Sequence, residues 1–237
     1  MSTTPKPLDR QTLDQVAGGS GQMDGHNGDD LIMGGPEGII LVGGAGDELM
    51  IGGSGNDVIL TGAGNDQAEG RDGHDDIDTG DGHDSAFGGE GHDRILLGQG
   101  FDFAQGDAGN DQIDGGGGAD QLFGGAGDDT LDGGAGDGAA DYAQGDGGDD
   151  TFLWGPGSGN DMFQGGEGQD TLQLQGVTID ALKQGLDLWN HGLTLTMGAD
   201  GAVRFLDAAG QPASFSGTFT LGGATLSFQD VERIVLR

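Results

Sequence analysis

The polar and apolar positions of the chain repeat with a period of nine residues over most of its length. Residues 52–60, with the sequence GGSGNDVIL, form a clear copy of the repeat. Sixteen such units run from 25 to 173 if two irregularities are allowed, a three-residue insertion in 133–144 and the extra pair Trp154 and Gly155. The fourth position is Gly in fifteen units, the sixth is acidic in fifteen, and the eighth is apolar in all sixteen. A period held this long predicts a stack of similar structural units.

Each unit divides into a glycine-rich half and a half centred on an apolar residue. The first half predicts a turn, because glycine reaches φ > 0 without a steric penalty, and the second predicts a three-residue strand. Two units then form one coil of 18 residues, and stacked coils form two parallel sheets with the eighth positions between them. One inward row is Leu41, Ile59, Ile77, Ile95, Ile113, Leu131, Phe152 and Leu172; the facing row is Ile32, Met50, Ala68, Ala86, Ala104, Leu122, Ala143 and Phe163. Large residues largely face small ones, as a thin and evenly spaced core requires.

The composition shows that cations are the natural partners of this chain. Its 237 residues include 56 Gly and no Cys, and its net charge is -33. The missing thiols exclude disulfides and Cys-ligated zinc, and the negative charge disfavours nucleic acid and anionic membranes. Neither a transmembrane stretch nor the apolar core of a Sec signal peptide is present in the sequence. Low hydropathy with high charge is typical of disorder, so we expect the chain to fold only when its charge is neutralised.

The sixth positions supply the candidate metal ligands. They are Asp30, Glu48, Asp57, Asp66, Asp75, Asp84, Asp93, Asp102, Asp111, Asp120, Asp129, Asp141, Asp150, Asp161 and Asp170, and only Ile39 interrupts the series. Acids two units apart stack on the same edge, about 4.8 Å apart, and would repel each other unless a cation lay between them. Calcium, which takes six to eight oxygen ligands, suits carboxylates beside turn carbonyls better than magnesium or zinc, and counting neighbouring pairs gives up to about thirteen ions. The alternative is an acidic surface that is merely solvated, which does not predict a strict period.

The pattern Gly-Gly-x-Gly-x-Asp-x-apolar-x resembles the RTX (repeats-in-toxin, hemolysin-type) calcium-binding nonapeptide of secreted bacterial proteins. The resemblance implies an all-β fold, a right-handed parallel β-roll that is a two-sheet solenoid. It also implies calcium (Ca2+) taken from the extracellular medium, and export of the unfolded chain by type I (ABC) secretion machinery. The metal ligands it implies are the sixth-position acids and turn carbonyls. Glu37 and Ile39 depart from the pattern in the unit 34–42, so no regular calcium site is expected between Ile39 and Asp57. Glu48 is longer than Asp, so its two sites are expected to be distorted.

Three histidines, His74, His83 and His92, occupy the fifth position of their units. Their spacing raises the alternative of a zinc or nickel site, but only His74 and His92 would share an edge. The other interpretation is an outward side chain on a residue whose carbonyl binds calcium.

The two ends of the chain differ from the repeat block 25–173. In residues 1–24, Leu8, Leu13 and Val16 before Gly18-Gly19 resemble a double-glycine leader, and the alternative is a short capping helix. Residues 174–237 predict a small β-rich cap containing one short helix, which Thr178 would N-cap and which would end at about Asn190. Strands are expected near 193–197, 203–206, 214–221, 225–228 and 234–236. The position of this segment also resembles the uncleaved C-terminal secretion region of RTX proteins.

These features predict a secreted, non-catalytic calcium-binding protein, found extracellularly or at the cell surface. No metalloprotease, nucleophile-elbow or phosphate-loop motif occurs in the chain. Alternatives are an accessory module of a secreted enzyme and a structural matrix or cell-surface protein. The first four units carry outward apolar residues, Leu31, Met33, Leu49 and Ile51 on one sheet and Ile40, Val42, Val58 and Leu60 on the other. Such faces are covered by an N-terminal helix or the tail, or they mediate self-association or binding to a secreted or cell-surface partner.

Overall fold

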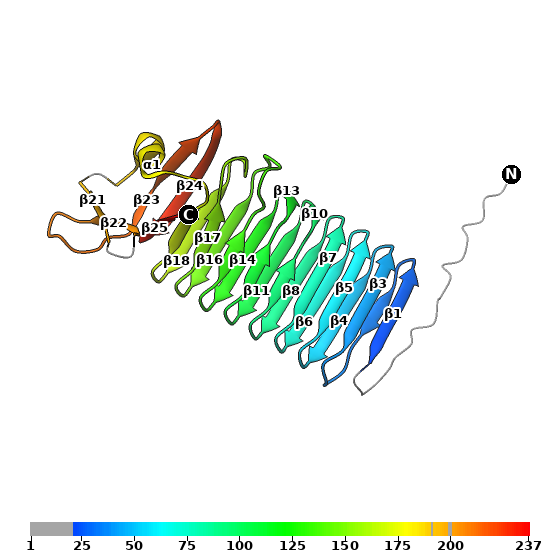
Figure 1. Cartoon of the computed structure of the whole chain (residues 1–237). Coiled ribbons are helices and arrows are strands. Elements are labelled where there is room, and N and C mark those ends of the chain that lie inside the picture. Colours follow the sequence, from blue (N-terminus) through cyan, green and yellow to red (C-terminus); the bar gives the residue numbers. More distant parts are fainter. Residues whose placement is uncertain (1–20, 191, 199–200) are drawn as a thin grey trace.

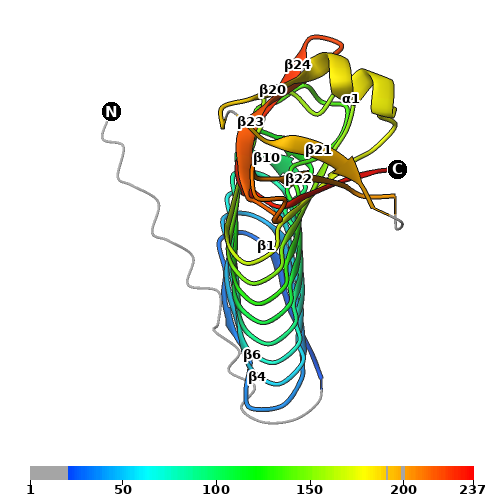
Figure 2. The ribbon, with the colours of Figure 1, turned by 90° about the vertical axis from the view of Figure 1, so that its left-hand side faces the viewer.

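The computed structural model describes residues 21–190, 192–198 and 201–237, and it is a β-solenoid. Flattened coils stack along one axis, and two parallel sheets run along its sides (Figures 1 and 2). The first sheet has the order β1 (Gln22–Asn27), β3 (Ile40–Ala45), β5 (Val58–Ala63), β7 (Asp76–Asp81), β9 (Arg94–Leu96), β12 (Gln112–Asp114), β15 (Thr130–Asp132), β17 (Thr151–Trp154), β19 (Thr171–Leu174), β25 (Arg233–Leu236), β22 (Val203–Leu206) and β21 (Thr194–Met197), and the short strands β10 (Gln99–Gly100) and β13 (Gly117–Gly118) pair beside this path. The second sheet has the order β2 (Leu31–Met33), β4 (Leu49–Ser54), β6 (Gln67–Asp72), β8 (Ser85–Glu90), β11 (Phe103–Ala108), β14 (Gln121–Ala126), β16 (Tyr142–Gly147), β18 (Met162–Glu167), β24 (Ala224–Val231), β23 (Phe215–Leu221) and β20 (Leu186–Leu188).

The core is the pair of inward rows that the period of nine predicts. Leu41 pairs with Ile59 and Ile59 with Ile77 in adjacent coils, and the same register continues along both sheets. Every residue of the two predicted rows is buried, with an exposed fraction of 5% or less. Met23 in β1 pairs with Leu41 and is also buried, so strand pairing begins at Gln22, before the first predicted unit.

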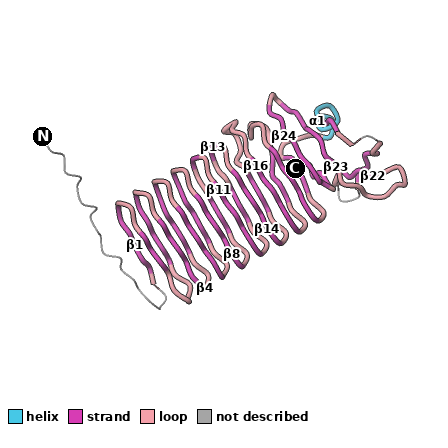
Figure 3. The backbone as a smooth tube through the Cα atoms, turned by 180° about the vertical axis from the view of Figure 1, so that it is seen from behind, coloured by secondary structure: helices cyan, strands magenta, loops and turns pink. Residues whose placement is uncertain are grey.

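The predicted three-residue strands were too short for much of the roll: eleven strands between β1 and β18 span six residues, while β2, β9, β12 and β15 have the predicted three. Positions one to three of the following unit continue each strand and pair with the next coil, for example Gly62 with Gly80. Gly62 has φ of +116°, a backbone conformation that side-chain-bearing residues rarely adopt. Where the strands span six residues, the turn is confined to positions four to six. Figure 3 shows these loops at the two edges of the stack. Glycine therefore serves here mainly to let neighbouring backbones approach each other closely.

The two irregularities of the repeat are loops that leave the stack intact. Phe103 pairs with Gln121, 18 residues away, whereas Gln121 pairs with Tyr142 across the three-residue insertion. Tyr142 then pairs with Met162 across the extra pair 154–155. The spacing between partners changes while the register of inward residues is kept, which agrees with the predicted phasing.

The C-terminal segment forms the predicted β-rich cap with one helix, α1 (Ile179–Gly185). The Thr178 hydroxyl accepts a hydrogen bond from the Ala181 amide at 3.2 Å, as expected of an N-cap. The helix ends at Gly185 and not near Asn190, because Gly185 lies against the Thr220 carbonyl and Leu186 then pairs with Phe219 in β23. The chain there enters β20, so Trp189 lies outside the helix.

The cap lies at the opposite end of the solenoid from the first four units (Figures 1 and 3). The alternative in which the tail folds back over the N-terminal apolar faces is therefore wrong. Leu31, Met33, Ile40 and Leu60 are 37–42% exposed on these faces. The leader at Gly18-Gly19 and the alternative N-terminal helix lie outside the described residues. In the described part of the chain, no helix is both long and apolar enough to cross a membrane.

Candidate metal centre

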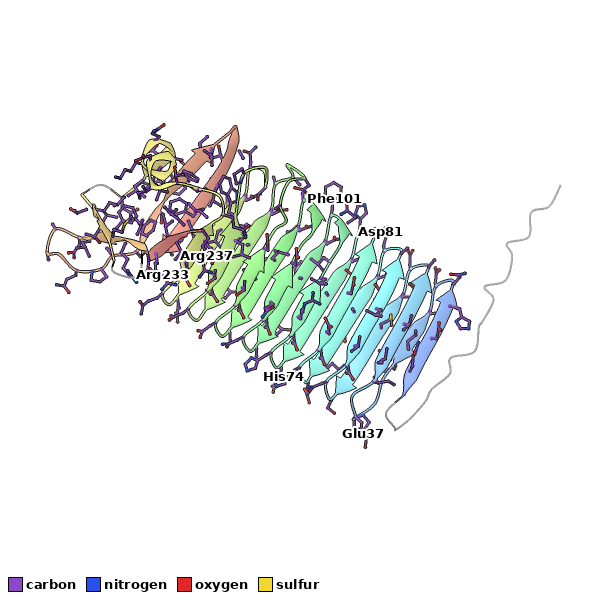
Figure 4. All side chains as sticks on the ribbon, in the orientation of Figure 1. Glu37, His74, Asp81, Phe101, Arg233 and Arg237 are labelled. Carbon is purple, nitrogen blue, oxygen red and sulfur yellow. The ribbon has the colours of Figure 1, made fainter. Side chains whose placement is uncertain are left out.

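The sixth-position acids line the two edges of the solenoid, where the turns stack. We name these the Asp57 edge, which also carries His74, and the Glu48 edge, which also carries Phe101; Figure 4 shows the two labelled side chains on opposite edges. Fourteen of the fifteen predicted acids, all except Asp30, are no more than 3% exposed. The structure thus places these carboxylates inside the turns and away from solvent.

In the thirteen sixth-position aspartates from Asp57 to Asp170, one carboxylate oxygen connects neighbouring coils. The Asp57 amide donates to Asp75 Oδ1 at 2.8 Å, and the Asp75 amide donates to Asp93 Oδ1 at 2.8 Å. The same bond recurs along both edges from Asp66 and Asp57 to Asp161 and Asp170. Even Ile39, which lacks a carboxylate, donates its amide to Asp57 Oδ1. Each of these thirteen aspartates therefore satisfies the backbone amide of the sixth position in the previous coil on its edge.

The second oxygen of each carboxylate is buried without a hydrogen-bond partner. This holds for Oδ2 of every predicted aspartate except Asp161, and for both carboxylate oxygens of Glu48. Burying an unpaired carboxylate oxygen costs free energy, and native proteins rarely do so without a compensating group. Fourteen residues with the same orphaned oxygen, in a chain with very few cations, indicate a missing positive partner at each turn.

Backbone carbonyls converge near these orphaned oxygens. At Gly70, a side chain would collide with both Asp75 Oδ2 and the Gly88 carbonyl, so these two oxygens lie on the same side of that backbone. The carbonyls of Arg71 and Gly73 point towards the turn of the next coil, where a side chain at Gly89 or Gly91 would meet them. The space between successive turns is thus lined by carboxylate and carbonyl oxygens, the donor set that calcium prefers. The residues present fit a hard cation.

Burial makes these carboxylates costly to ionise in the absence of a cation. It raises the pKa of Asp75, Asp120, Asp129 and Asp150 to about 7, and that of Asp141 to about 8, and neighbouring carboxylates add a smaller increase. Burial and then the Asp66 charge raise the pKa of Glu48 to about 8. A bound dication would reverse both effects by favouring the charged form.

The fifth positions form a second ladder that sequence reasoning missed. His74 Nδ1 accepts from the His92 amide at 2.7 Å, and His83 Nδ1 accepts from the Phe101 amide at 2.9 Å. Asn and Asp side chains make the equivalent bond elsewhere, such as the Asn65 amide to Asp47 Oδ1 at 2.8 Å. The sequence did contain a signal for this ladder. Position five is mostly Asp, Asn or His, and each of these side chains has a hydrogen-bond acceptor, Oδ1 or Nδ1, bonded to Cγ.

The predicted zinc or nickel alternative gains no support from the histidine geometry. The rings of His74 and His92 stack at 5.0 Å, while His83 lies on the other edge against Phe101. The Nδ1 atoms of these three histidines are already occupied by amides. Among the described residues, no group of three or more His, Asp or Glu side chains is arranged to hold a metal by itself.

Comparison with known protein families identifies the type of repeat in the block 25–173. The model of the RTX calcium-binding nonapeptide repeat matches the chain in four copies, at residues 42–77, 69–104, 105–140 and 156–174. No curated protein matches the chain significantly. The matched segments contain most of the stacked turns, of the inward rows and of the buried carboxylates described above. The chain therefore belongs to the family of RTX calcium-binding nonapeptide repeat proteins.

Proposed function

We propose that this is a secreted, non-catalytic protein whose β-roll folds when calcium binds between its coils. The ligands are the carboxylates of the fifteen sixth-position acids together with turn carbonyls. The observation that carries the proposal is the row of buried carboxylate oxygens without hydrogen-bond partners. The family match supports the choice of calcium over other cations.

Without cations, the balance of energies opposes folding. The thin core consists of two rows of single side chains, several of them alanine, while 56 glycines lose much backbone entropy on folding. Stacked carboxylates add repulsion between coils. Calcium removes the repulsion and satisfies the orphaned oxygens, so its binding free energy becomes folding free energy.

Such a switch suits export. Cytosolic free calcium is too low to fill sites of the weak affinity that extracellular modules have, roughly 10⁻⁴–10⁻³ M. The chain would stay unfolded while it passes through a type I ABC exporter and would fold in the medium. The net charge of -33 would keep the unfolded chain soluble.

Far-UV circular dichroism of the full chain tests this proposal. In chelator the spectrum should show a disordered chain, and millimolar calcium should convert it to a β spectrum, whereas equimolar magnesium should not. The same β spectrum in chelator and in calcium would contradict the proposal.

A second role, association through the N-terminal apolar faces, is favoured by one observation. Leu31 and Met33 on the second sheet and Ile40 and Leu60 on the first are exposed at the end of the roll that the cap does not reach. Light scattering in millimolar calcium, comparing the native protein with Leu60→Asp, tests self-association or docking there. A monomer in both proteins would reject self-association.

A further inference from the structure

The C-terminal segment contributes an additional coil to the roll. Although the other strands of the cap pair antiparallel, β24 pairs parallel with β18 and β25 pairs parallel with β19, in the register of the repeats. Phe228 lies opposite Phe163, and Ile234 lies opposite Leu172. Both are fully buried and extend the two inward rows by one residue each. Residues 224–236 contain no glycine, so the repeat pattern does not identify this coil in the sequence.

The turn between β24 and β25 reproduces the hydrogen bonds of a repeat turn. The Asp170 amide donates to Glu232 Oε2 at 2.7 Å, as the Asp150 amide donates to Asp170 Oδ1 at 2.9 Å. The Arg233 amide donates to the Asp170 carbonyl at 3.0 Å, as the Thr171 amide donates to the Asp150 carbonyl at 2.8 Å. Glu232 thus occupies the sixth position of the next turn on the Asp57 edge.

This turn is shorter than a repeat turn, which explains its unusual residues. Asp230 follows the residue paired with Gln164 and so occupies the first position, and Val231 alone separates it from Glu232. A repeat has four residues in this interval. The longer side chain of Glu and the positive φ of Asp230, +53°, allow the shortened turn to reach the same amide.

The oxygens of a calcium site recur at this junction. Asp170 Oδ2 belongs to a fully buried residue and has no hydrogen-bond partner. A side chain at Gly165 would collide with both Asp170 Oδ2 and the Asp230 carbonyl, just as one at Gly145 would collide with Asp150 Oδ2 and the Gly165 carbonyl. The Asp230 carbonyl therefore takes the place of the first-position carbonyl of a following repeat.

We propose that Asp170, the Asp230 carbonyl and Glu232 form a terminal calcium site, which fastens the cap to the roll. The inference rests on the proposed function, since it assigns one more ion of the same kind to residues outside the nonapeptide repeats. The competing cation is a guanidinium. Arg204, Arg233 and Glu232 line the same groove of about 390 Å³. Figure 4 shows Arg233 where the cap meets the roll.

The two tryptophans of the chain report on this junction. Trp154 is buried at the last coils and meets Phe219 of the cap edge to face, with ring centroids 5.6 Å apart. Trp189 lies in the cap itself. Tryptophan fluorescence therefore follows attachment of the cap, while far-UV circular dichroism follows folding of the whole roll.

The test compares Glu232→Gln with Glu167→Gln in the full chain. In Glu232→Gln, the new amide group can still accept from the Asp170 amide but carries no charge, and Glu167 is an exposed acid of β18 that gives the same change of charge. In Glu232→Gln, the calcium midpoint seen by tryptophan fluorescence should rise about tenfold. Equilibrium dialysis should find one calcium ion fewer per chain in Glu232→Gln than in the native protein. Glu167→Gln should change neither the fluorescence midpoint nor the number of bound ions.

Three results would overturn the proposal. The first is a Glu232→Gln protein with the fluorescence midpoint and ion count of Glu167→Gln. The second is a shifted midpoint with an unchanged ion count, accompanied by the same shift in Arg233→Gln, because Glu232 would then pair with arginine. The third concerns Glu232→Asp, which keeps the negative charge, so its calcium midpoint should lie closer to that of the native protein than the midpoint of Glu232→Gln does. A midpoint of Glu232→Asp that lies further from the native value than that of Glu232→Gln would contradict a metal ligand at this position. A native chain with no calcium response in circular dichroism would instead contradict the proposed function itself.

Discussion

Replacing one buried carboxylate by an amide should have opposite effects with and without calcium. Asp111 lies in the middle of the Asp57 edge, is 1% exposed, and accepts from the Asp93 amide through Oδ1 at 2.7 Å. An asparagine at this position would keep the acceptor and nearly the same volume, but its second polar atom would carry no charge. We therefore expect Asp111→Asn to stabilise the calcium-free roll and to weaken the response to calcium.

The size of the stabilisation follows from the ionisation of Asp111. Burial, opposed in part by the hydrogen bond from the Asp93 amide, raises the pKa of Asp111 from 3.8 to about 6. Each pKa unit corresponds to 1.36 kcal/mol, so ionised Asp111 destabilises the calcium-free roll by at most about 3 kcal/mol at pH 7.5. Solvent screening lowers this to about 1–2 kcal/mol. With calcium, the lost ligand charge should raise the folding midpoint about tenfold.

The assay measures folding under both conditions. In chelator, a trimethylamine N-oxide titration drives folding and is followed by circular dichroism, and Asp111→Asn should fold at a lower osmolyte concentration than the native chain. A calcium titration then gives the second midpoint. Asp78→Asn, an exposed change on β7, is the control for net charge. If Asp111→Asn destabilised the roll in chelator as well, the carboxylate would be a structural hydrogen-bonding group and not an unpaired charge awaiting a cation.

Two further predictions concern protons and glycines. The pKa of Asp75, Asp129 and Asp150 is raised in the folded state, so the calcium-free roll binds protons more tightly than the unfolded chain and gains stability as the pH falls from 8 to 5. Circular dichroism in chelator should therefore show β structure increasing on acidification, while the calcium midpoint rises because protons compete for the ligands; a loss of β structure over this range would contradict the argument. Gly91→Ala should destabilise the calcium-loaded roll by more than about 1 kcal/mol in urea, because the residue has φ of +147° and its new methyl group would meet the Gly73 carbonyl. Gly136→Ala, with φ of +88° and open space around it, adds backbone strain alone and should cost less; equal losses would show that backbone strain, not the close approach of coils, sets the need for glycine.

Repetition explains why so much of this fold was predictable. The eighth position fixes which side chain faces inward, so rows such as Leu41, Ile59 and Ile77 follow from counting alone, and two insertions can be placed where the count fails. The strand length was not predictable in the same way. Glycine at positions one to three is read as a turn, whereas pairing with neighbouring coils extends the strand through it.

The residues of the calcium sites could be predicted from the sequence, but the hydrogen bonding of their carboxylate oxygens could not. Acid at every sixth position identifies the candidate ligands, yet the division between Oδ1, which bonds an amide, and Oδ2, which has no partner, depends on backbone positions that a pattern does not contain. The coil formed by residues 224–236 was not predicted from the sequence, for a related reason. Its turn reaches Asp170 through a shortened loop and Glu232, so the hydrogen bond is kept while the sequence signature is lost.

The most direct measurement of the central claim is the anomalous X-ray difference density of a crystal grown in calcium. The account predicts peaks between successive turns along both edges, each within 2.3–2.6 Å of a sixth-position carboxylate oxygen and of turn carbonyls. Absence of anomalous peaks beside the Oδ2 atoms of Asp75, Asp93 and Asp111 in a calcium-saturated crystal would contradict it, because those oxygens would then be buried without the cation that the whole account requires.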